Sequence, residues 1–418
     1  MRKGPAVRAW LVAALAAAGL VAVPAVPAVA APNCTDPGTA FAPVPWPQRM
    51  FNVERVWALT RGANVRIAVL DSGVDAGHPQ LAGRIEPGTD LIAPGGNGAQ
   101  DCAGRGTQTA GIIVAQPQPN IGFHGIAPQA TVIPVRVSDN ETSGPSAGVA
   151  GLANGIRFAV SRGAKVILVP MAAYLPSPDL AAAVATAVAA DVLIVAAVGE
   201  DGGSNGGNRV PYPASLPGVI GVAPIEESTM AARNSGRGPF IDLVAPGAAV
   251  VSTQRGGGLT LVNGSAYAAA FVAGAAALVR SWWPTMPIAE VTQRLMATAA
   301  PAPGGIDSTA YGYGIVNPYG ALADQLTDAE PGALPGLDQD DASDLARERS
   351  WTSSGNLARL LAGIGVLVAL ALVGLGAAVP RGRLRRWRPR ITRQPVQRAE
   401  DEEPSPPVRL FADRETTT

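Results

Sequence analysis

The sequence predicts an α/β domain in which helices cover both faces of a parallel β-sheet. Short apolar runs rich in β-branched residues alternate with helical stretches from about residue 52 to residue 322. The runs stay apolar at consecutive positions, as strands do when both faces of their sheet are covered. Parallel strands need right-handed crossovers, which the helical stretches between them supply. The pattern contains no internal repeat, so we expect one large domain.

Five of the apolar runs are the predicted strands, at residues 65–71, 130–137, 164–170, 191–199 and 218–225. Two helices are predicted between strands, at residues 145–162 and 177–190. Two more begin in glycine-containing segments, GRGTQTAGII (104–113) and NGSAYAAAFVAGAAALVRSWWP (263–284). The domain is predicted to cover residues 51–323. The proline-rich residues 31–50 lack periodicity, and we expect them to form an N-terminal extension on its surface.

The N-terminal segment has the composition of a secretory signal peptide. Arg2, Lys3 and Arg8 precede an apolar run, which small residues end at Ala28-Val29-Ala30. This order of basic, apolar and A-x-A segments is typical of cleavable export signals. We therefore expect residues 1–30 to be removed, with an uncleaved N-terminal anchor as the alternative.

A second apolar segment predicts a membrane span near the C-terminus. Residues 360–379 contain no charge and no proline, and a helix of that length reaches about 30 Å, the thickness of one bilayer core. Arginines cluster directly after it, which indicates the cytoplasmic side. We predict an acidic linker (324–356), a transmembrane helix (357–380) and a cytoplasmic tail (381–418), with the main domain extracytoplasmic. A buried core helix is the alternative.

Charge and cysteine content narrow the class of protein further. The formal net charge is zero, so no basic field indicates nucleic-acid binding. The two cysteines, Cys34 and Cys102, both lie in the part predicted to be exported. An oxidising compartment and an even count favour one disulfide between the extension and the loop before Arg105. Two unpaired thiols are the alternative. We expect neither a metal nor a cofactor.

Three motifs occur in a chain order with chemical meaning. VRIAVLDSGVDAGHPQL (65–81) ends a strand at Asp71, and GRGTQTAGII and NGSAYAAAF each begin a helix. Together they resemble the subtilisin-like serine peptidases, whose triad follows the order Asp, His, Ser. The segments ERVWALTRGANVRIAVLDSGVD, DCAGRGTQTAGIIVAQP, GFHGIAP, DLVAPG and YGYGIVNPYGAL resemble the mycosins of actinobacterial type VII secretion systems. The signal peptide, extension and single C-terminal span match the same family.

The resemblance implies a subtilisin-like fold and assigns four site positions, three of which hold a different residue here. The triad aspartate is Asp71. The histidine position is Arg105, in GRGT, and the nucleophile position is Ala266, in GSAYAAA. The oxyanion-binding asparagine corresponds to Glu200, in AAVGE. The resemblance therefore implies a family member whose catalytic site has degenerated.

Each replacement removes one step of serine-peptidase chemistry. The serine proton needs a base, and an arginine stays protonated at any working pH. Alanine has no nucleophilic atom. A carboxylate would repel the oxyanion, whereas the amide donor it replaces lowers the barrier by about 3–4 kcal/mol. Together the three changes make the usual reaction implausible.

The chain offers few substitutes for the missing groups. His78 lies in HPQL, a segment that is commonly structural in the family, and His124 lies in a separate turn. Ser265 is adjacent to Ala266, but a shift of one residue at a helix start turns the side chain by about 100°. We expect no rebuilt active site.

The replacing residues have a predicted structural role of their own. Arg105 is expected to form a bidentate ion pair with Asp71, and Glu200 is a candidate second partner of the same guanidinium. The alternative is that each position drifted independently and the side chains do not touch.

Two functions from different classes follow. The first is a membrane-anchored pseudopeptidase that acts as a structural component of a type VII secretion complex. The second is an active serine endopeptidase that processes secreted proteins. Expected partners are the membrane and components of the secretion membrane complex, and peptide segments are a further candidate ligand of the former cleft.

Overall fold

The computed structural model describes residues 34–326, apart from 140–144, 146, 201–208, 304, 306 and 307, together with residues 361–366. The chain divides into two compact units at residue 327, and the first unit contains the α/β fold. The predicted signal peptide, cytoplasmic tail and most of the linker lie outside the described residues. Of the predicted span, residues 361–366 are described, and they are helical. In the described part of the chain, no helix has the length and apolar character needed to span a bilayer.

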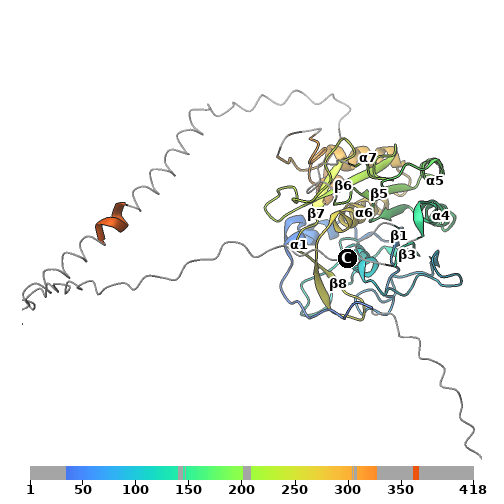
Figure 1. Ribbon diagram of the computed structural model, residues 1–418, viewed down its shortest axis with the longest axis horizontal. Coiled ribbons are helices and arrows are strands. Elements are labelled where there is room, and N and C mark those ends of the chain that lie inside the picture. Colours follow the sequence, from blue (N-terminus) through green and yellow to red (C-terminus); the bar gives the residue numbers. More distant parts are fainter. Residues whose placement is uncertain are drawn as a thin grey trace, which may run out of the picture. The chain divides into compact units, whose positions relative to one another are not determined.

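Seven parallel strands form the central sheet, in the order β2-β3-β1-β4-β5-β6-β7 (Figure 1). They are β1 (Arg66–Asp71), β2 (Thr89–Asp90), β3 (Thr131–Arg136), β4 (Val166–Val169), β5 (Leu193–Ala197), β6 (Val219–Ile225) and β7 (Leu243–Pro246). The five predicted strands are confirmed as β1, β3, β4, β5 and β6. The sequence pattern missed β2, which has only two residues, and β7, which lies within the DLVAPG segment.

Helices cover both faces of the sheet, as the apolar strands predicted. They are α1 (Trp46–Phe51), α2 (Val53–Trp57), α3 (Arg105–Val114), α4 (Gly148–Ser161), α5 (Pro178–Ala189), α6 (Ser265–Trp282), α7 (Ile288–Ala297) and α8 (Pro318–Ala323). Helices α3 and α6 pack against each other on one face, and α4 and α5 pack together on the other. Since β3 and β4 lie on opposite sides of β1, right-handed crossovers place α3 and α4 on opposite faces.

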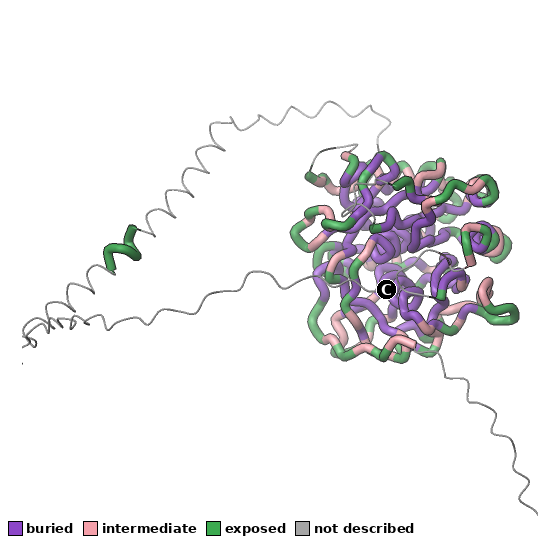
Figure 2. The backbone as a smooth tube through the Cα atoms, in the orientation of Figure 1, coloured by how far each residue is buried: buried purple, intermediate pink, exposed green. Residues whose placement is uncertain are grey.

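Helix α6 is the central element of the core. Every residue from Ser265 to Arg280 is buried, and the helix packs across five strands of the sheet. Gly274 also lets the helix pack closely on the segment before β3, since a Cβ at this position would lie only 2.0 Å from the side chain of Ile126. Figure 2 shows the buried residues concentrated in the sheet and in the helices that pack on it.

The N-terminal extension differs in part from its prediction as a surface segment. Residues 34–39 run along a hairpin formed by β8 (Val250–Thr253) and β9 (Leu259–Val262), where Thr39 pairs with Leu259. The extension then enters α1, and Trp46 and Gln48 are buried. The indole N–H of Trp46 anchors this part of the extension, because it donates to the carbonyls of Ala248 and Ala249.

Candidate functional site

The candidate site lies where β1 ends and α3 begins. Asp71 is the last residue of β1, and Arg105 is the first residue of α3. Asp101 fixes the start of this helix, because its carboxylate accepts the backbone N–H groups of Gly104 and Thr107, both at 2.8 Å. Ser72 ties the two elements together, since its hydroxyl accepts the N–H of Gly106 at 3.0 Å.

The glycine at position 106 allows the start of α3 to lie close to the turn that follows β1. A Cβ at this position would lie 1.8 Å from the carbonyl oxygen of Gly73. Such a contact is impossible for any other residue without moving the turn after β1. The second glycine of the GRGT motif therefore sets the short distance between the side chains of Asp71 and Arg105.

Asp71 and Arg105 form a buried ion pair. The Nε–H of Arg105 donates to Oδ1 of Asp71 at 2.7 Å, and both side chains are almost completely inaccessible to solvent. The predicted pairing is confirmed, but it is not bidentate. Oδ2 of Asp71 accepts instead from the hydroxyl of Thr109 at 3.1 Å. Thr109 lies one helical turn after Arg105, a spacing from which the sequence could have indicated this contact.

The ion pair fixes the charge state of the arginine. Burial by itself disfavours a charged guanidinium, but the adjacent Asp71 carboxylate, together with the nearby Tyr267 and Asp101, outweighs burial and raises the pKa of Arg105. Burial raises the pKa of Asp71, and the charge of Arg105 opposes this rise. Arg105 therefore stays protonated and is unable to accept a proton from a neighbouring hydroxyl.

The predicted contact between Glu200 and the Arg105 guanidinium is absent from the described residues. The Glu200 carboxylate contacts Ser265 instead. Oε1 of Glu200 accepts the backbone N–H of Ser265 at 2.7 Å and its hydroxyl at 2.8 Å. Gly199, with φ of +79°, turns the chain after β5 toward the start of α6. The N-terminus of a helix has N–H donors without an intrahelical partner and a partial positive charge. Both attract a carboxylate, which explains why Glu200 binds there.

Ala266 is the second residue of α6, and its methyl group is buried. The adjacent Ser265 is also buried, and its hydroxyl has two partners. It donates to Glu200 and accepts the N–H of Gly199 at 3.0 Å. A hydroxyl engaged in this way supports the local backbone and is poorly placed to attack a substrate.

Both histidines have structural surroundings. Nε2 of the buried His78 lies 3.0 Å from the carbonyl oxygen of Gly258, and its Nδ1 accepts the N–H of Gln80. This arrangement suits a neutral ring, and burial lowers the pKa of His78. The ring of His124 packs on Trp57 with 4.6 Å between centroids, and burial lowers its pKa as well. Within the described residues, neither ring contacts Asp71, Arg105 or Ser265.

A disulfide joins Cys34 and Cys102, as predicted. It fastens the extension to the loop before α3, where Thr35 also donates its N–H to the carbonyl of Cys102. Side chains continue this connection inward. Gln254 donates to the carbonyl of Asp36 and accepts from Gln108, and Gln108 accepts from the hydroxyl of Tyr267. The extension is thereby linked to both helices of the site.

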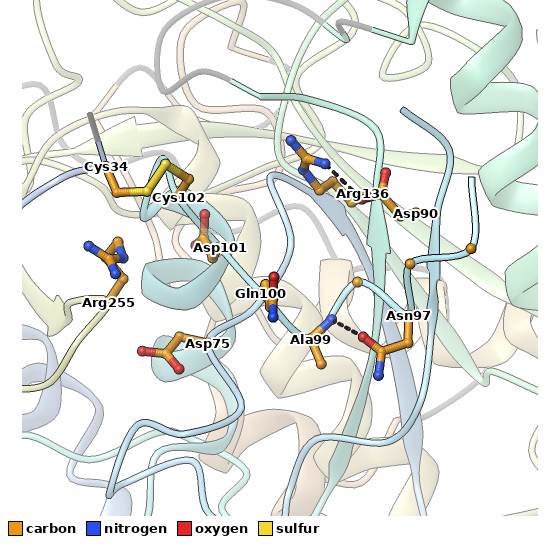
Figure 3. A pocket seen from close by; sticks show the side chains of 13 residues that line it. Cys34, Asp75, Asp90, Asn97, Ala99, Gln100, Asp101, Cys102, Arg136 and Arg255 are labelled. Atoms are coloured by element: carbon orange, nitrogen blue, oxygen red, sulfur yellow. Dashed lines mark hydrogen bonds and ion pairs between the residues drawn. A yellow bond between two sulfur atoms is a disulfide. The ribbon is translucent and has the colours of Figure 1, made fainter. Parts of the chain in front are cut away.

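A polar cavity of about 700 Å³ lies beside the disulfide (Figure 3). Five charged residues line it: Asp75, Asp90, Asp101, Arg136 and Arg255. Arg136 pairs with Asp90 at 2.7 Å, and each carboxylate accepts backbone N–H groups of a nearby turn. Each carboxylate therefore stabilises its own turn, and that of Asp101 stabilises the loop that leads into α3. Within the described residues, no three His, Cys, Asp or Glu side chains gather as a metal site.

The parallel sheet, the Asp71 position and the two helix starts define the class of this protein. The subtilase family profile matches residues 62–314. The chain belongs to the subtilase family. It is 36% identical to subtilisin E of Bacillus subtilis over 256 residues, which is 61% of this chain and 65% of that protein. The chain thus spans just under two thirds of the length of that relative.

The mycosins are similar over a longer part of the chain. Mycosin-1 of Mycobacterium tuberculosis is 30% identical over 338 residues, covering 69% of this chain and 75% of the relative. A crystal structure of the mycosin MycP1 without its propeptide superposes with a TM-score of 0.62 at 30% identity, covering 69% of this chain and all of that one. The periplasmic assembly of the ESX-5 inner membrane complex contains a chain with a TM-score of 0.62 at 29% identity, covering 72% of this chain and 91% of that one.

Proposed function

We propose that this protein is a mycosin-like pseudopeptidase that serves as a structural component of a type VII secretion complex. The observation that carries the proposal is the buried Arg105–Asp71 ion pair. In the subtilase mechanism, this aspartate orients a histidine base. Here it neutralises a permanent cation, and the position assigned to the nucleophile holds Ala266.

The environment of Glu200 supports the same proposal. Stabilising an oxyanion requires hydrogen-bond donors directed at the developing charge. Glu200 instead presents a carboxylate, which engages the N–H of Ser265 at the start of α6. The groups that replace the base and the oxyanion donor thus bind other parts of the fold, and the group that replaces the nucleophile is a methyl.

The proposed location follows from the ends of the chain and from the relatives. We propose that the domain lies on the extracytoplasmic side, anchored by a helix at 357–380 with the arginine-rich tail in the cytosol. The disulfide suits an oxidising compartment. The similarity to mycosin-1 and to a chain of the ESX-5 periplasmic assembly supports partners in a secretion membrane complex.

A fluorophosphonate probe on the purified extracytoplasmic domain tests this proposal against the alternative of an active serine endopeptidase. We expect no specific labelling of the natural protein, because the assigned nucleophile position lacks a hydroxyl. We expect labelling to require Arg105→His and Ala266→Ser together, and peptide hydrolysis to require Glu200→Asn as well. Specific labelling of the natural protein, lost on heat denaturation, would contradict the pseudopeptidase.

Affinity purification of the full-length protein in mild detergent tests the structural role. We expect other membrane-complex components to copurify in fixed ratio. Recovery of the protein alone, under conditions that preserve a mycosin-containing complex, would remove the support for a scaffold.

A further inference from the structure

Positive charge gathers at the end of the domain opposite the candidate site. That site lies at the carboxyl end of β1, where Asp71 meets α3. At the amino end of the same strand, Arg66 begins β1 beside Lys165, the residue that precedes β4. The two are direct neighbours, because Lys165 donates its backbone N–H to the carbonyl of Arg66 at 2.8 Å. Both residues are exposed.

Three further arginines lie at this end. Arg162 follows α4, and its carbonyl accepts an N–H of the Arg66 guanidinium at 2.9 Å. Arg61 and Arg84 are joined through Gln129, which lies two residues before β3. The backbone N–H of Gln129 donates to the carbonyl of Arg61 at 2.9 Å, and its carbonyl accepts from the Arg84 guanidinium at 3.4 Å. We call these five cations the amino-end cluster: Arg61, Arg66, Arg84, Arg162 and Lys165.

No member of the amino-end cluster has a carboxylate partner within the described residues. The carboxylates at the same end have other surroundings. Asp191 pairs with the buried Arg280 at 2.7 Å, Glu86 accepts the hydroxyl of Thr131 at 2.6 Å, and Glu290 lies in the first turn of α7. This end of the domain therefore carries an excess of positive charge that the fold itself does not pair.

Backbone carbonyls hold three of the guanidiniums in place. Arg66 donates to Arg162, Arg84 donates to Gln129, and Arg162 donates to Pro87 at 3.3 Å. Each of these bonds uses one N–H of a guanidinium that has five. The remaining donors are thus held on the surface with restricted freedom, and a guanidinium fork matches the two oxygens of a carboxylate. Restricting the donors before binding lowers the entropy cost of pairing with such a ligand.

An exposed tryptophan lies beside the cluster. Trp282 ends α6 and is 43% exposed. The preceding Ser281 fixes this end of the helix to the loop that contains Arg61, since its hydroxyl donates to the carbonyl of Ala63 at 2.9 Å and lies 3.0 Å from the hydroxyl of Thr60. Tryptophan and arginine are the residues that most often dominate protein interfaces. A lipid surface, by contrast, is bound through a larger apolar area than one tryptophan supplies.

We propose that the amino-end cluster is a docking surface for an acidic segment of a partner protein, which lies beside Trp282. The carboxylates of that segment pair with the cations that have no carboxylate partner in the domain. The proposal deepens the proposed function by naming the chemistry of a partner, and it rests on that function in assuming a protein partner. The partner contacts the end of the domain opposite Asp71 and Arg105.

Cross-linking to Lys165 tests the proposal, because Lys165 and Lys3 are the only lysines of the chain. The probe is an N-acetylated peptide of six glutamates, one of them activated as an N-hydroxysuccinimide ester. It forms an amide with a lysine but not with the arginine-rich tail. The full-length protein is held in phosphatidylcholine nanodiscs, and mass spectrometry of its digest measures the yield at Lys165 separately from the amino terminus. We expect a yield about fivefold above that of a probe whose other five residues are glutamine, and loss of this difference at 1 M salt.

Arg66→Glu combined with Arg162→Glu keeps Lys165 and reverses the charge of its neighbours. We expect the yield from the glutamate probe to fall about fivefold. Arg233→Glu combined with Arg237→Glu is the matched control, since it makes the same change of net charge at exposed residues between β6 and β7. The control should leave the yield unchanged. If the first variant does not fold, as judged by circular dichroism, Arg66→Gln with Arg162→Gln replaces it, with a smaller loss expected.

Two results overturn the proposal. One is an equal yield at Lys165 from the natural protein and from a folded Arg66 and Arg162 variant, which would leave these arginines a role in the fold alone. The other is protection of Lys165 from acetylation when phosphatidylglycerol is added to the nanodiscs, which would make a lipid surface the ligand of the cluster. Copurification addresses the proposed function separately, because a protein that binds the probe but purifies alone would keep the docking surface and lose the scaffold role.

Discussion

Position 105 illustrates how one residue changes the role of its neighbour. Asp71 lies at the end of a strand, where it is buried with Thr109 and the N–H of Ser72 as hydrogen-bond partners. A carboxylate buried in this way needs a cation nearby, because desolvation of an unpaired charge costs several kcal/mol. Arg105 supplies that charge permanently, whereas a histidine supplies it only when protonated.

Arg105→Met should therefore destabilise the domain strongly. The variant leaves the Asp71 carboxylate buried without a cation, and we expect the free energy of unfolding to fall by about 3–5 kcal/mol. Urea denaturation of the subtilase domain measures the change. Arg157→Met is the control, because its ion pair with Asp179 is exposed and should contribute little to stability. Equal losses in both variants would show that the buried pair has no special role.

Asp242 provides a pH-dependent prediction at the same scale. Burial raises the pKa of its carboxyl to about 6, while the N–H of Gly221 donates to Oδ2 at 2.8 Å and opposes the rise. Between pH 4 and pH 6, approximately, the folded state holds a proton that the unfolded state has released. The stabilisation from Asp242 is therefore complete below about pH 4 and is lost as the pH rises through 6.

Asp242→Asn should remove this loss, because the amide stays neutral and its oxygen still accepts from Gly221. We expect the variant to be more stable than the natural domain by about 3 kcal/mol at pH 8 and equally stable near pH 4. Thermal denaturation at both pH values measures the difference. A gain of the same size at both values would exclude titration of Asp242 as its cause.

At the scale of elements, the N-terminus of α6 is capped by a side chain from the segment that follows β5. The residue before the helix, Gly264, provides no side-chain cap. Glu200 takes this function from the end of β5, with its carboxylate on the N–H and the hydroxyl of Ser265. A negative charge is favourable there because the helix dipole places partial positive charge at its N-terminus.

Glu200→Ala should lower the free energy of unfolding by about 1 kcal/mol, and Glu200→Gln by about half as much, since the amide keeps an acceptor without the charge. Denaturation at low salt and at 1 M salt separates the contribution of the charge from that of the hydrogen bond, because salt screens only the charge. Glu227→Ala is the matched control, since the ion pair of Glu227 with Arg49 is exposed. A larger loss in the glutamine variant than in the alanine variant would contradict capping by Glu200.

At the scale of the whole molecule, the extension and the site form one connected structure. The Cys34–Cys102 disulfide closes a loop of 68 residues that includes β1 and Asp71. Gln254 and Gln108 continue the connection to Tyr267 on α6. The extension is therefore connected by hydrogen bonds to α3 and α6, the two helices that contain Arg105 and Ala266.

Replacing both cysteines with alanine should lower the free energy of unfolding by about 2–4 kcal/mol, because the unfolded chain gains freedom that the cross-link removed. Hydrogen exchange should rise in residues 34–39 and at the start of α3, while the central sheet stays protected. Unchanged exchange at the start of α3 would show that the polar side chains hold the extension without the disulfide.

Local pattern predicted the main features of the fold. The runs that became β1, β3, β4, β5 and β6 were visible because fully buried strands are apolar at every position. The two-residue β2 is too short for such a pattern. The four residues of β7 are all buried, as those of β4 are, but in the sequence they were considered only as part of the DLVAPG motif. The entry of the extension into α1 was missed as well, because its burial depends on contacts between Trp46 and residues 202 or more positions away.

The sequence by itself determined that the positions assigned to the base and the nucleophile hold neither, because an arginine stays protonated at any working pH and an alanine has no nucleophilic atom. It also determined the layered fold, through the spacing of apolar residues. Only the tertiary structure decided the partners of the two polar replacing groups: Arg105 with Asp71 through one N–H, and Glu200 with Ser265. The physical reason is that these partners come from different strands and helices, whose ends meet only when the sheet has formed.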